Sequence, residues 1–164
     1  AFSTAMARPL VPALSFAVMR PPVLRGRQSR WREPASEPEQ PLWVEADALR
    51  LRQVIDNLIS NAVKFSPVQG VVMVRLIEVQ QNIRFEVEDF GNGIPVEFQK
   101  HIFGKFSQAD SSDSRAKEGS GLGLAICKKI IENHHGQIGF TTSAGQGSVF
   151  WFKLAQQHQP VLTE

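Results

Sequence analysis

Three short stretches of the sequence carry side chains that could do chemistry, and the first holds two amides and an ammonium group. Asn57, Asn61 and Lys64 are spaced by four and three residues, so on an α-helix they share one face. An amide oxygen can ligate a hard cation, and a lysine can meet a phosphate group. A stripe of Asn and Lys is more often an ordinary solvated helix face, so these residues alone do not identify a site.

The second stretch is Asp-Phe-Gly-Asn-Gly-Ile-Pro, which begins at Asp89 directly after an alternating segment. A carboxylate at a strand end lies where open α/β sheets bind ligands, and it can accept a hydrogen bond from an exocyclic amine such as that of adenine. Gly91 and Gly93 would let the backbone approach a flat ring. By itself the run is more typical of an ordinary Asp-Gly turn.

The third stretch, Gly-Ser-Gly-Leu-Gly-Leu, occupies residues 119–124 and opens an apolar periodic segment. Glycines at a helix N-terminus leave backbone N–H groups and the positive end of the helix dipole available to phosphate. The spacing is neither GxGxxG, because Leu124 takes the place of the last glycine, nor GxxxxGK[ST]. The dinucleotide fold and the P-loop are therefore disfavoured, and a flexible glycine hinge is the competing interpretation.

The elements that must position these residues follow from hydrophobic periodicity. Residues 48–65 repeat apolar side chains at spacings of three and four, which predicts an amphipathic helix with Asp47 as its N-cap. The other predicted elements are two strand hairpins, an edge strand and two more helices: 71–79 with 82–89, 137–142 with 148–154, 42–44, 95–103 and 122–134. Two hairpins among helices predict a two-layer α/β sandwich, in which helices cover one face of a mixed, mostly antiparallel sheet.

The charge of the chain is unevenly distributed. Six of the 18 basic side chains lie in residues 1–32, which hold no acidic residue, so residues 33–164 carry 12 basic and 16 acidic side chains. A mildly acidic body argues against nucleic acid as a partner. The single cysteine, Cys127, excludes an internal disulfide and suits a reducing, cytoplasmic compartment. No run reaches the roughly 20 apolar residues of a membrane helix, so no membrane insertion by this segment is expected.

Prolines divide the chain into a tail and a body. Seven of the ten prolines lie in residues 1–41, where no hydrophobic period is sustained. We therefore predict a linker or disordered tail over 1–40, one folded domain over 41–155 and a C-terminal tail over 156–164. A chain that starts near Glu39 is expected to keep the ligand affinity and thermal midpoint of the full chain.

In this order, the three stretches resemble the ATP-binding domains of histidine kinases, in the superfamily shared with DNA gyrase, a heat-shock chaperone and the mismatch-repair ATPases. Four motifs carry the resemblance, the N box, the first glycine box, the F box and the second glycine box: 58–65, 89–93, 102–106 and 119–123. The resemblance implies the Bergerat type of ATP-binding fold, with ATP and Mg²⁺ as cofactors.

The resemblance also implies roles for individual residues. Asn61 would ligate Mg²⁺ with help from Asn57, Lys64 would touch phosphate, and Asp89 would bind adenine. The polar stretch 107–120 would lie within an ATP lid. Two basic side chains would reach the outer phosphates: Lys105 and Arg115. Further nucleotide contacts would come from the two glycine boxes and their flanks: Gly91, Gly93, Ile94, Gly119, Gly121, Leu122 and Gly123.

The activity implied by the resemblance is transfer of the ATP γ-phosphate to a histidine. The implied partners are a dimerisation and histidine-phosphotransfer domain of the same full-length protein and, indirectly, the receiver domain of a response regulator. None of the four histidines is followed by the Glu-x-x-x-Pro surroundings of the phospho-acceptor motif, so the acceptor is expected outside this chain.

Two alternatives stay open at the level of sequence. A non-catalytic nucleotide-sensing module, a degenerate kinase, is disfavoured by the intact Asn61, Asp89 and glycines. A gyrase-type ATPase would carry Glu where Asn57 stands. An amide cannot take a proton from water, so poor hydrolysis is expected.

Overall fold

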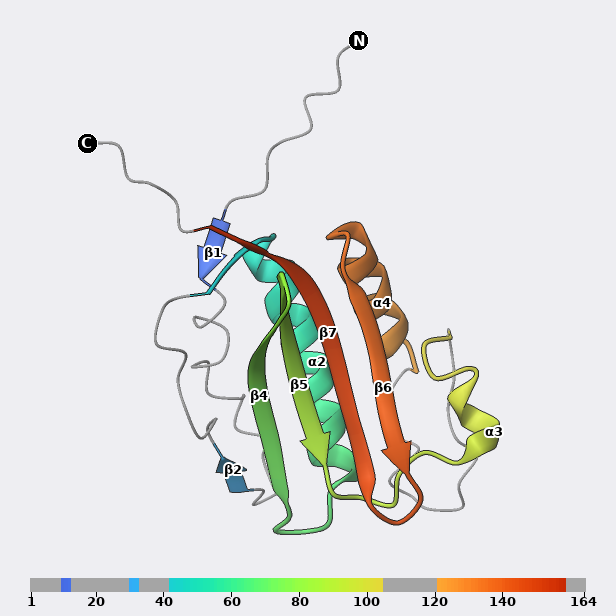
Figure 1. The fold of residues 1–164 in the computed structure, drawn as a ribbon. Helices are drawn as coiled ribbons and strands as arrows, with labels where there is room; N and C mark the ends of the chain where they lie inside the picture. Colours follow the sequence, from blue (N-terminus) through green and yellow to red (C-terminus); the bar gives the residue numbers. More distant parts are fainter. Residues whose placement is uncertain (1–9, 13–29, 33–41, 105–120, 159–164) are drawn as a thin grey trace, which may run out of the picture.

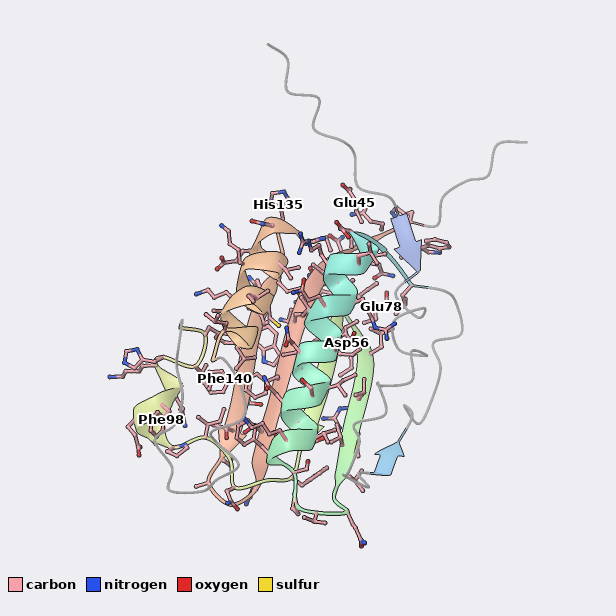
Figure 2. The ribbon with its side chains drawn as sticks, turned by 180° about the vertical axis from the view of Figure 1, so that it is seen from behind. Glu45, Asp56, Glu78, Phe98, His135 and Phe140 are labelled. Carbon is pink, nitrogen blue, oxygen red and sulfur yellow. The ribbon has the colours of Figure 1, made fainter. Side chains whose placement is uncertain are left out.

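The computed structural model describes the chain at residues 10–12, 30–32, 42–104 and 121–158. Within these ranges, two long helices cover one face of a seven-stranded sheet (Figure 1). The view from behind shows the two helices side by side on that face (Figure 2). The predicted two-layer α/β sandwich with helices on one face is confirmed.

The sheet is mixed and mostly antiparallel, as the sequence predicts. Its strands, in chain order, are β1 (Leu10–Pro12), β2 (Arg30–Arg32), β3 (Trp43–Glu45), β4 (Val71–Val79), β5 (Asn82–Asp89), β6 (Gln137–Ser143) and β7 (Gly147–Gln157). They are arranged in the order β1-β3-β7-β5-β4-β2, and β6 also pairs with β7. Only the pairing of β2 with β4 is parallel among those in the described part of the chain.

The helices are α2 (Ala48–Phe65), α3 (Val96–Gln99) and α4 (Gly123–Asn133). Helix α2 has the predicted bounds, and the Asp47 side chain caps it by accepting a hydrogen bond from the Arg50 N–H at 3.0 Å. The prediction of a helix over 95–103 is too long. After α3, the N–H groups of His101 and Gly104 bond to carbonyls three residues earlier, which forms tight turns instead of another helical turn.

Two strands lie in the segment predicted to be a linker. β1 pairs antiparallel with β3, and β2 pairs parallel with β4, so each extends an edge of the sheet. A strand of three residues is too short to show a period of two, so no sequence pattern predicts it. The domain boundary at residue 41 stays a prediction.

His134 joins the two long helices at their far ends. Its Nδ1 donates to the Ile130 carbonyl at 2.7 Å, and its Nε2 accepts from the Asp47 N–H at 3.0 Å. The imidazole is buried, and these two bonds require the neutral ring with its proton on Nδ1. The C-terminus of α4 is thereby fixed to the N-terminus of α2.

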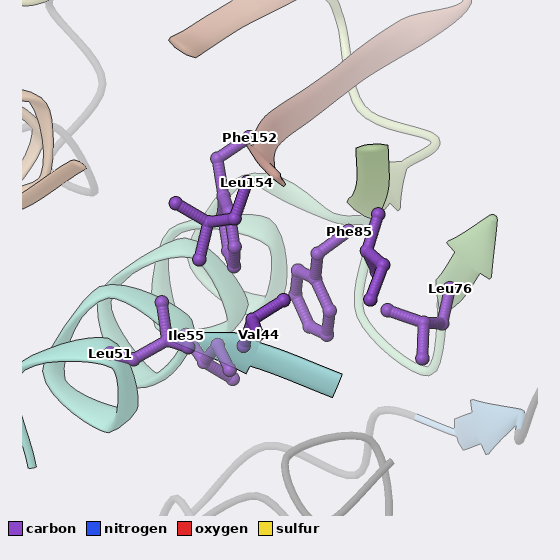
Figure 3. A pocket seen from close by; sticks show the side chains of 8 residues that line it. Val44, Leu51, Ile55, Leu76, Phe85, Phe152 and Leu154 are labelled. Carbon is purple, nitrogen blue, oxygen red and sulfur yellow. The ribbon is translucent and has the colours of Figure 1, made fainter. Parts of the chain in front are cut away.

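The core between α2 and the sheet contains a small cavity of about 20 Å³ (Figure 3). Eight apolar residues line it: Val44, Leu51, Ile55, Leu76, Ile83, Phe85, Phe152 and Leu154. A space of this size holds about one water-sized sphere, and its lining offers no polar group to orient a molecule. It is a packing cavity, so the candidate site must lie elsewhere.

Candidate functional site

The helix-covered face of the sheet changes from apolar to polar at one end. One row across β6, β7 and β5 is apolar: Phe140, Phe150 and Val87. The next row consists of Thr142, Ser148 and Asp89, which are register partners across the same three strands. Directly opposed residues have Cβ atoms about 4.5–5.5 Å apart, so the three polar side chains are neighbours. This polar row marks the candidate site, at the lower end of the sheet in Figure 1.

Asp89 is a buried carboxylate, with a relative exposure of 5%. Its Oδ1 accepts from the Gly91 N–H at 3.0 Å. Burial raises the pKa of Asp89, and the neighbouring Glu88 adds to this rise, while hydrogen bonds from the backbone of Gly91 and Ser148 oppose it. A carboxylate can accept about four hydrogen bonds, so Asp89 has capacity left for a donor on a ligand.

The two glycines after Asp89 are required by close backbone packing. A Cβ on Gly91 would collide with the carbonyl oxygen of Phe65, the last residue of α2. A Cβ on Gly93, which has a φ of +75°, would collide with the carbonyl oxygen of Ser143. The sequence suggested that these glycines make room for a ring, but the space on the Cβ side of each is filled by protein backbone. The end of α2 and the loop after β5 therefore lie in contact.

The β6–β7 hairpin fastens this loop. The Ile94 N–H donates to Thr142 Oγ1 at 2.9 Å, and the Gly145 N–H donates to the Asn92 carbonyl at 2.9 Å. Neither Thr142 nor Ser148 belongs to a motif recognised in the sequence. A signal was available: both are polar residues at inward positions of strands whose other inward residues are apolar.

Asn57 lies against the first turn of α4. A Cβ on Gly123 would be 3.0 Å from Asn57 Oδ1, so the absence of a side chain there lets the two helices approach. Asn57 also hydrogen-bonds the Cys127 thiol, which is fully buried. Burial raises the pKa of Cys127 to about 12, and the bond from Asn57 offsets a part of this rise. Cys127 is therefore a free thiol in the core.

The N-terminus of α4 has the geometry expected of an anion site. The helix has 11 residues, and within the described part of the chain no side chain caps its start. Helix α4 starts on the side nearer to the end of the sheet where β5 ends (Figure 1). The N–H groups of a first helical turn have no partner within the helix and point out of its start. Gly121, just before the helix, has a φ of +65°, a conformation that favours glycine.

The remaining predicted site residues are only partly described. Asn61 and Lys64 are half-buried on α2, and Lys64 Nζ lies 5.2 Å from the centroid of the Phe65 ring. Lys105, Arg115 and Gly119 lie outside the described residues. So does the stretch 107–120 that was assigned to a lid. The structure thus connects Asn57 with Gly123, and Asp89 with Gly91, but gives no position for the two predicted phosphate-binding cations beyond residue 104.

The described residues include neither a group of His, Cys, Asp and Glu side chains that could bind a metal nor a helix that could span a membrane. No three His, Cys, Asp or Glu side chains in ranges 42–104 and 121–158 are grouped so that they could hold a metal ion. Amide ligands such as Asn61 are not members of such a group. Within the same ranges, every helix is too short or too polar to cross a membrane.

A family sequence model and individual relatives match the same part of the chain and point to one protein family. A sequence model described as histidine kinase-, DNA gyrase B- and HSP90-like ATPase matches residues 46–158. The circadian input-output histidine kinase CikA of Thermosynechococcus vestitus is 42% identical over 115 residues, which cover 70% of this chain and 16% of CikA. The sensory/regulatory protein RpfC of Xanthomonas campestris pv. campestris is 40% identical over 139 residues, covering 81% of this chain and 19% of RpfC.

Solved structures of similar proteins agree with the fold. The mycobacterial sensor histidine kinase MprB superposes with a TM-score of 0.65 at 30% identity, covering 73% of this chain and 80% of that chain. Full-length ShkA in complex with AMPPNP superposes with a TM-score of 0.70 at 30% identity, covering 96% of this chain and 34% of that chain. The chain spans less than a fifth of the length of the curated relatives CikA and RpfC. It belongs to the family of histidine kinase-, DNA gyrase B- and HSP90-like ATPases.

Proposed function

We propose that this chain is the ATP-binding catalytic domain of a sensor histidine kinase, which presents ATP so that its γ-phosphate is transferred to a histidine of a separate dimerisation domain. The observation that carries the proposal is the buried Asp89 carboxylate, which retains acceptor capacity at the end of the sheet where α2 also ends. Membership of an ATPase family supports a nucleotide as the ligand of this acceptor.

The adenine end of the nucleotide would lie at Asp89. A carboxylate that already accepts from the Gly91 N–H can accept a further bond from the exocyclic amine of adenine. Gly93 and Ile94 belong to the loop that the β6–β7 hairpin holds in place, so they would form one wall of the base pocket. A fixed wall costs no ordering entropy when the ligand binds.

The phosphates and Mg²⁺ would lie between α2 and the start of α4. The backbone at Leu122 and Gly123, where α4 starts, and the glycine at 121 with its positive φ would suit phosphate oxygens. The amide oxygen of Asn61 is a suitable ligand for Mg²⁺, which would neutralise charge on the phosphates during transfer.

Further phosphate contacts are assigned by motif position. Lys64 would reach the phosphates from α2, and Lys105, Arg115 and Gly119 would approach from the segment outside the described residues. Phosphoryl transfer depends mainly on positioning and on neutralising charge, so these residues need no covalent role.

Asn57 argues for transfer over hydrolysis. A gyrase-type ATPase needs a carboxylate there to take a proton from water, and an amide cannot do so. The side chain of Asn57 also hydrogen-bonds Cys127 and contacts Gly123, so it packs in the interface between α2 and α4. Any help that Asn57 gives to the metal would be secondary to this packing role.

The partners follow from the proposed activity. The acceptor histidine would lie on a dimerisation and histidine-phosphotransfer domain of the same full-length protein, and the phosphate would then pass to a response-regulator receiver domain. ATP and a receiver domain are available in the cytoplasm, so this part of the protein would work there. A degenerate, non-catalytic kinase remains the second candidate, and it differs from the first in the transfer step alone.

Phosphoryl transfer from labelled ATP distinguishes a catalytic histidine kinase from a degenerate, non-catalytic one. The purified chain with γ-labelled ATP and Mg²⁺ should hydrolyse ATP slowly and form no acid-labile phosphate on itself. Addition of a cognate helical hairpin that carries the acceptor histidine should give acid-labile phosphohistidine. Asn61→Ala should abolish this transfer, because the variant lacks the proposed metal ligand. Asn133→Ala, an exposed amide at the far end of α4, is the matched control and should transfer normally.

Two outcomes would contradict the proposal. Labelling of the isolated chain on one of its own histidines, which are His101, His134, His135 and His158, would mean that the acceptor is not on a separate domain. Nucleotide binding without transfer to the cognate hairpin would favour the degenerate kinase.

A further inference from the structure

We propose that Thr142 determines specificity for the nucleotide base, by making Ser148 a hydrogen-bond acceptor beside Asp89. Thr142 is a positioning residue, because it acts on the base through Ser148 and Ile94 and not by contact. The inference rests on the proposed function, which puts the base at Asp89, and it adds how the pocket would distinguish an amino group from a carbonyl.

The hydrogen bonds of Thr142 determine where its single hydroxyl proton lies. Thr142 Oγ1 is 3.0 Å from the Gly147 carbonyl, which can only accept, so Thr142 donates there. The Ile94 N–H can only donate, so Thr142 accepts that bond at 2.9 Å. The third contact, 3.0 Å to Ser148 Oγ, could run in either direction taken alone. With the Thr142 proton committed to Gly147, Ser148 must be the donor.

This arrangement leaves Ser148 with lone pairs and no proton to offer a ligand. Ser148 is buried, and it is the register partner of Asp89 on the helix-covered face of the sheet. Asp89, when ionised, is also an acceptor only. The polar row therefore presents two neighbouring acceptors, which complement the two hydrogens of an amino group or a water that donates to both. A carbonyl oxygen in that place, as in guanine, would face two acceptors with no proton between them.

The same hydroxyl holds the wall of the pocket. The bond from the Ile94 N–H to Thr142 fixes the loop that starts at Asp89. A valine at position 142 has nearly the same shape but can neither accept from Ile94 nor receive the Ser148 proton. Ser148 would then be free to turn its proton toward the ligand, and the pocket would lose its all-acceptor character.

The experiment compares ATP with GTP, because the two bases differ at the amino or carbonyl group in question. Dissociation constants of both nucleotides with Mg²⁺ are measured by calorimetry on the full chain, for the wild type and for Thr142→Val and Thr142→Ser. We expect Thr142→Val to weaken ATP about tenfold and to lower the preference for ATP over GTP by a similar factor, since one discriminating hydrogen bond is typically worth this much. Thr142→Ser keeps the hydroxyl and should restore the preference. Thr141→Val, on the exposed side of β6, is the matched control and should bind as the wild type does.

The ATP and GTP affinities of the variants either support or overturn the role of Thr142 in base specificity. If Thr142→Val weakens ATP and GTP equally, the residue supports the loop without setting specificity, and the inference is overturned. Ser148→Ala leaves the bond between Ile94 and Thr142 in place and gives a second test should Thr142→Val not fold. An unchanged ATP preference in Ser148→Ala overturns the inference as well. A wild-type chain that binds no ATP overturns the proposed function along with it, so the two failures are distinguishable.

Discussion

At Asp89 the requirements of folding and of ligand binding oppose each other. Burial raises the pKa of this carboxyl, so the ionised form is costly in the free protein. Two backbone hydrogen bonds, from Gly91 and Ser148, offset this cost only in part. A ligand that donates a further hydrogen bond would stabilise the ionised carboxylate. Such a perturbed pKa in a buried group is typical of functional residues, which can lower the stability of the free protein.

Asp89→Asn tests this residue directly. An amide that turns its NH₂ group to the ligand cannot accept from adenine, so ATP should bind roughly 10- to 100-fold more weakly, the usual loss for a hydrogen bond to a charged group. Calorimetry with ATP and Mg²⁺ measures the change. Glu88→Gln is the matched control, because Glu88 is adjacent in sequence but points to the opposite face, where it pairs with Arg75 at 2.7 Å. Equal ATP affinity in the wild type and Asp89→Asn would rule out the assignment.

The raised pKa of Asp89 also predicts a pH dependence of stability. Between 3.8, the ordinary value, and the higher folded-state pKa, the folded protein binds more protons at Asp89 than the unfolded chain does. The contribution of Asp89 to the free energy of unfolding therefore falls as pH rises through that window. Asp89→Asn should remove this contribution. Urea denaturation of both proteins at a series of pH values above 3.8 measures the difference, and parallel curves would contradict it.

Among the elements, helix α2 is joined to the rest of the molecule along one face and at both ends. One face supplies seven buried residues to the core, from Leu51 to Val63. The N-terminus is joined to α4 through His134, and the C-terminus contacts the loop after β5 at Gly91. Asn57 and Asn61 are therefore held by an element that is fixed at both ends, which suits side chains that must meet a ligand in one geometry.

Two leucines of α2 provide a stability test with an internal control. Leu51 is 2% exposed and lines the apolar cavity, whereas Leu49 is 83% exposed. Leu51→Ala enlarges a cavity that the fold already tolerates and should lower the free energy of unfolding by about 2–5 kcal/mol. Leu49→Ala should change it by no more than about 0.5 kcal/mol. Urea denaturation measures both variants, and similar losses would contradict the described orientation of α2.

At the scale of the whole molecule, the candidate site and the apolar cavity lie in different parts of the helix-covered face of the sheet. The end with Asp89 carries the candidate site, and the apolar cavity lies between α2 and the sheet among residues from other rows, such as Val44 and Leu154. The edges are extended by β1 and β2, from a segment whose sequence suggests a tail. These two edge strands have three residues each, and short edge strands limit pairing with other chains.

The strands β1 and β2 change what we expect of a shortened chain. A chain starting near Glu39 should bind ATP as the full chain does, because no proposed site residue precedes Asn57. Its thermal midpoint should fall by roughly 4–8 °C, since the loss of a few backbone hydrogen bonds costs about 2 kcal/mol. Calorimetric scans and ATP titrations of both chains measure the two effects. An unchanged midpoint would return the segment to the role of a dispensable tail.

The sequence by itself determined the features that depend on neighbours along the chain. Asp47 as the cap of α2, the bounds of that helix and the first hairpin follow from capping chemistry and from periods of 3.6 and two, which are local properties. The order of the four motifs was enough to identify the family, and the chemical type of Asp89 and Asn61 was enough to suggest a role for each.

Tertiary structure decided which of these residues are neighbours. Asp89, Thr142 and Ser148 meet because β5, β6 and β7 pair in one register, and a shift of one residue would turn each side chain to the other face of the sheet. No local pattern fixes that register over more than 50 residues of chain. The hydroxyl proton of Thr142 is assigned by bonds that only this pairing creates, so the sequence supplied the functional groups and the fold gave them their direction.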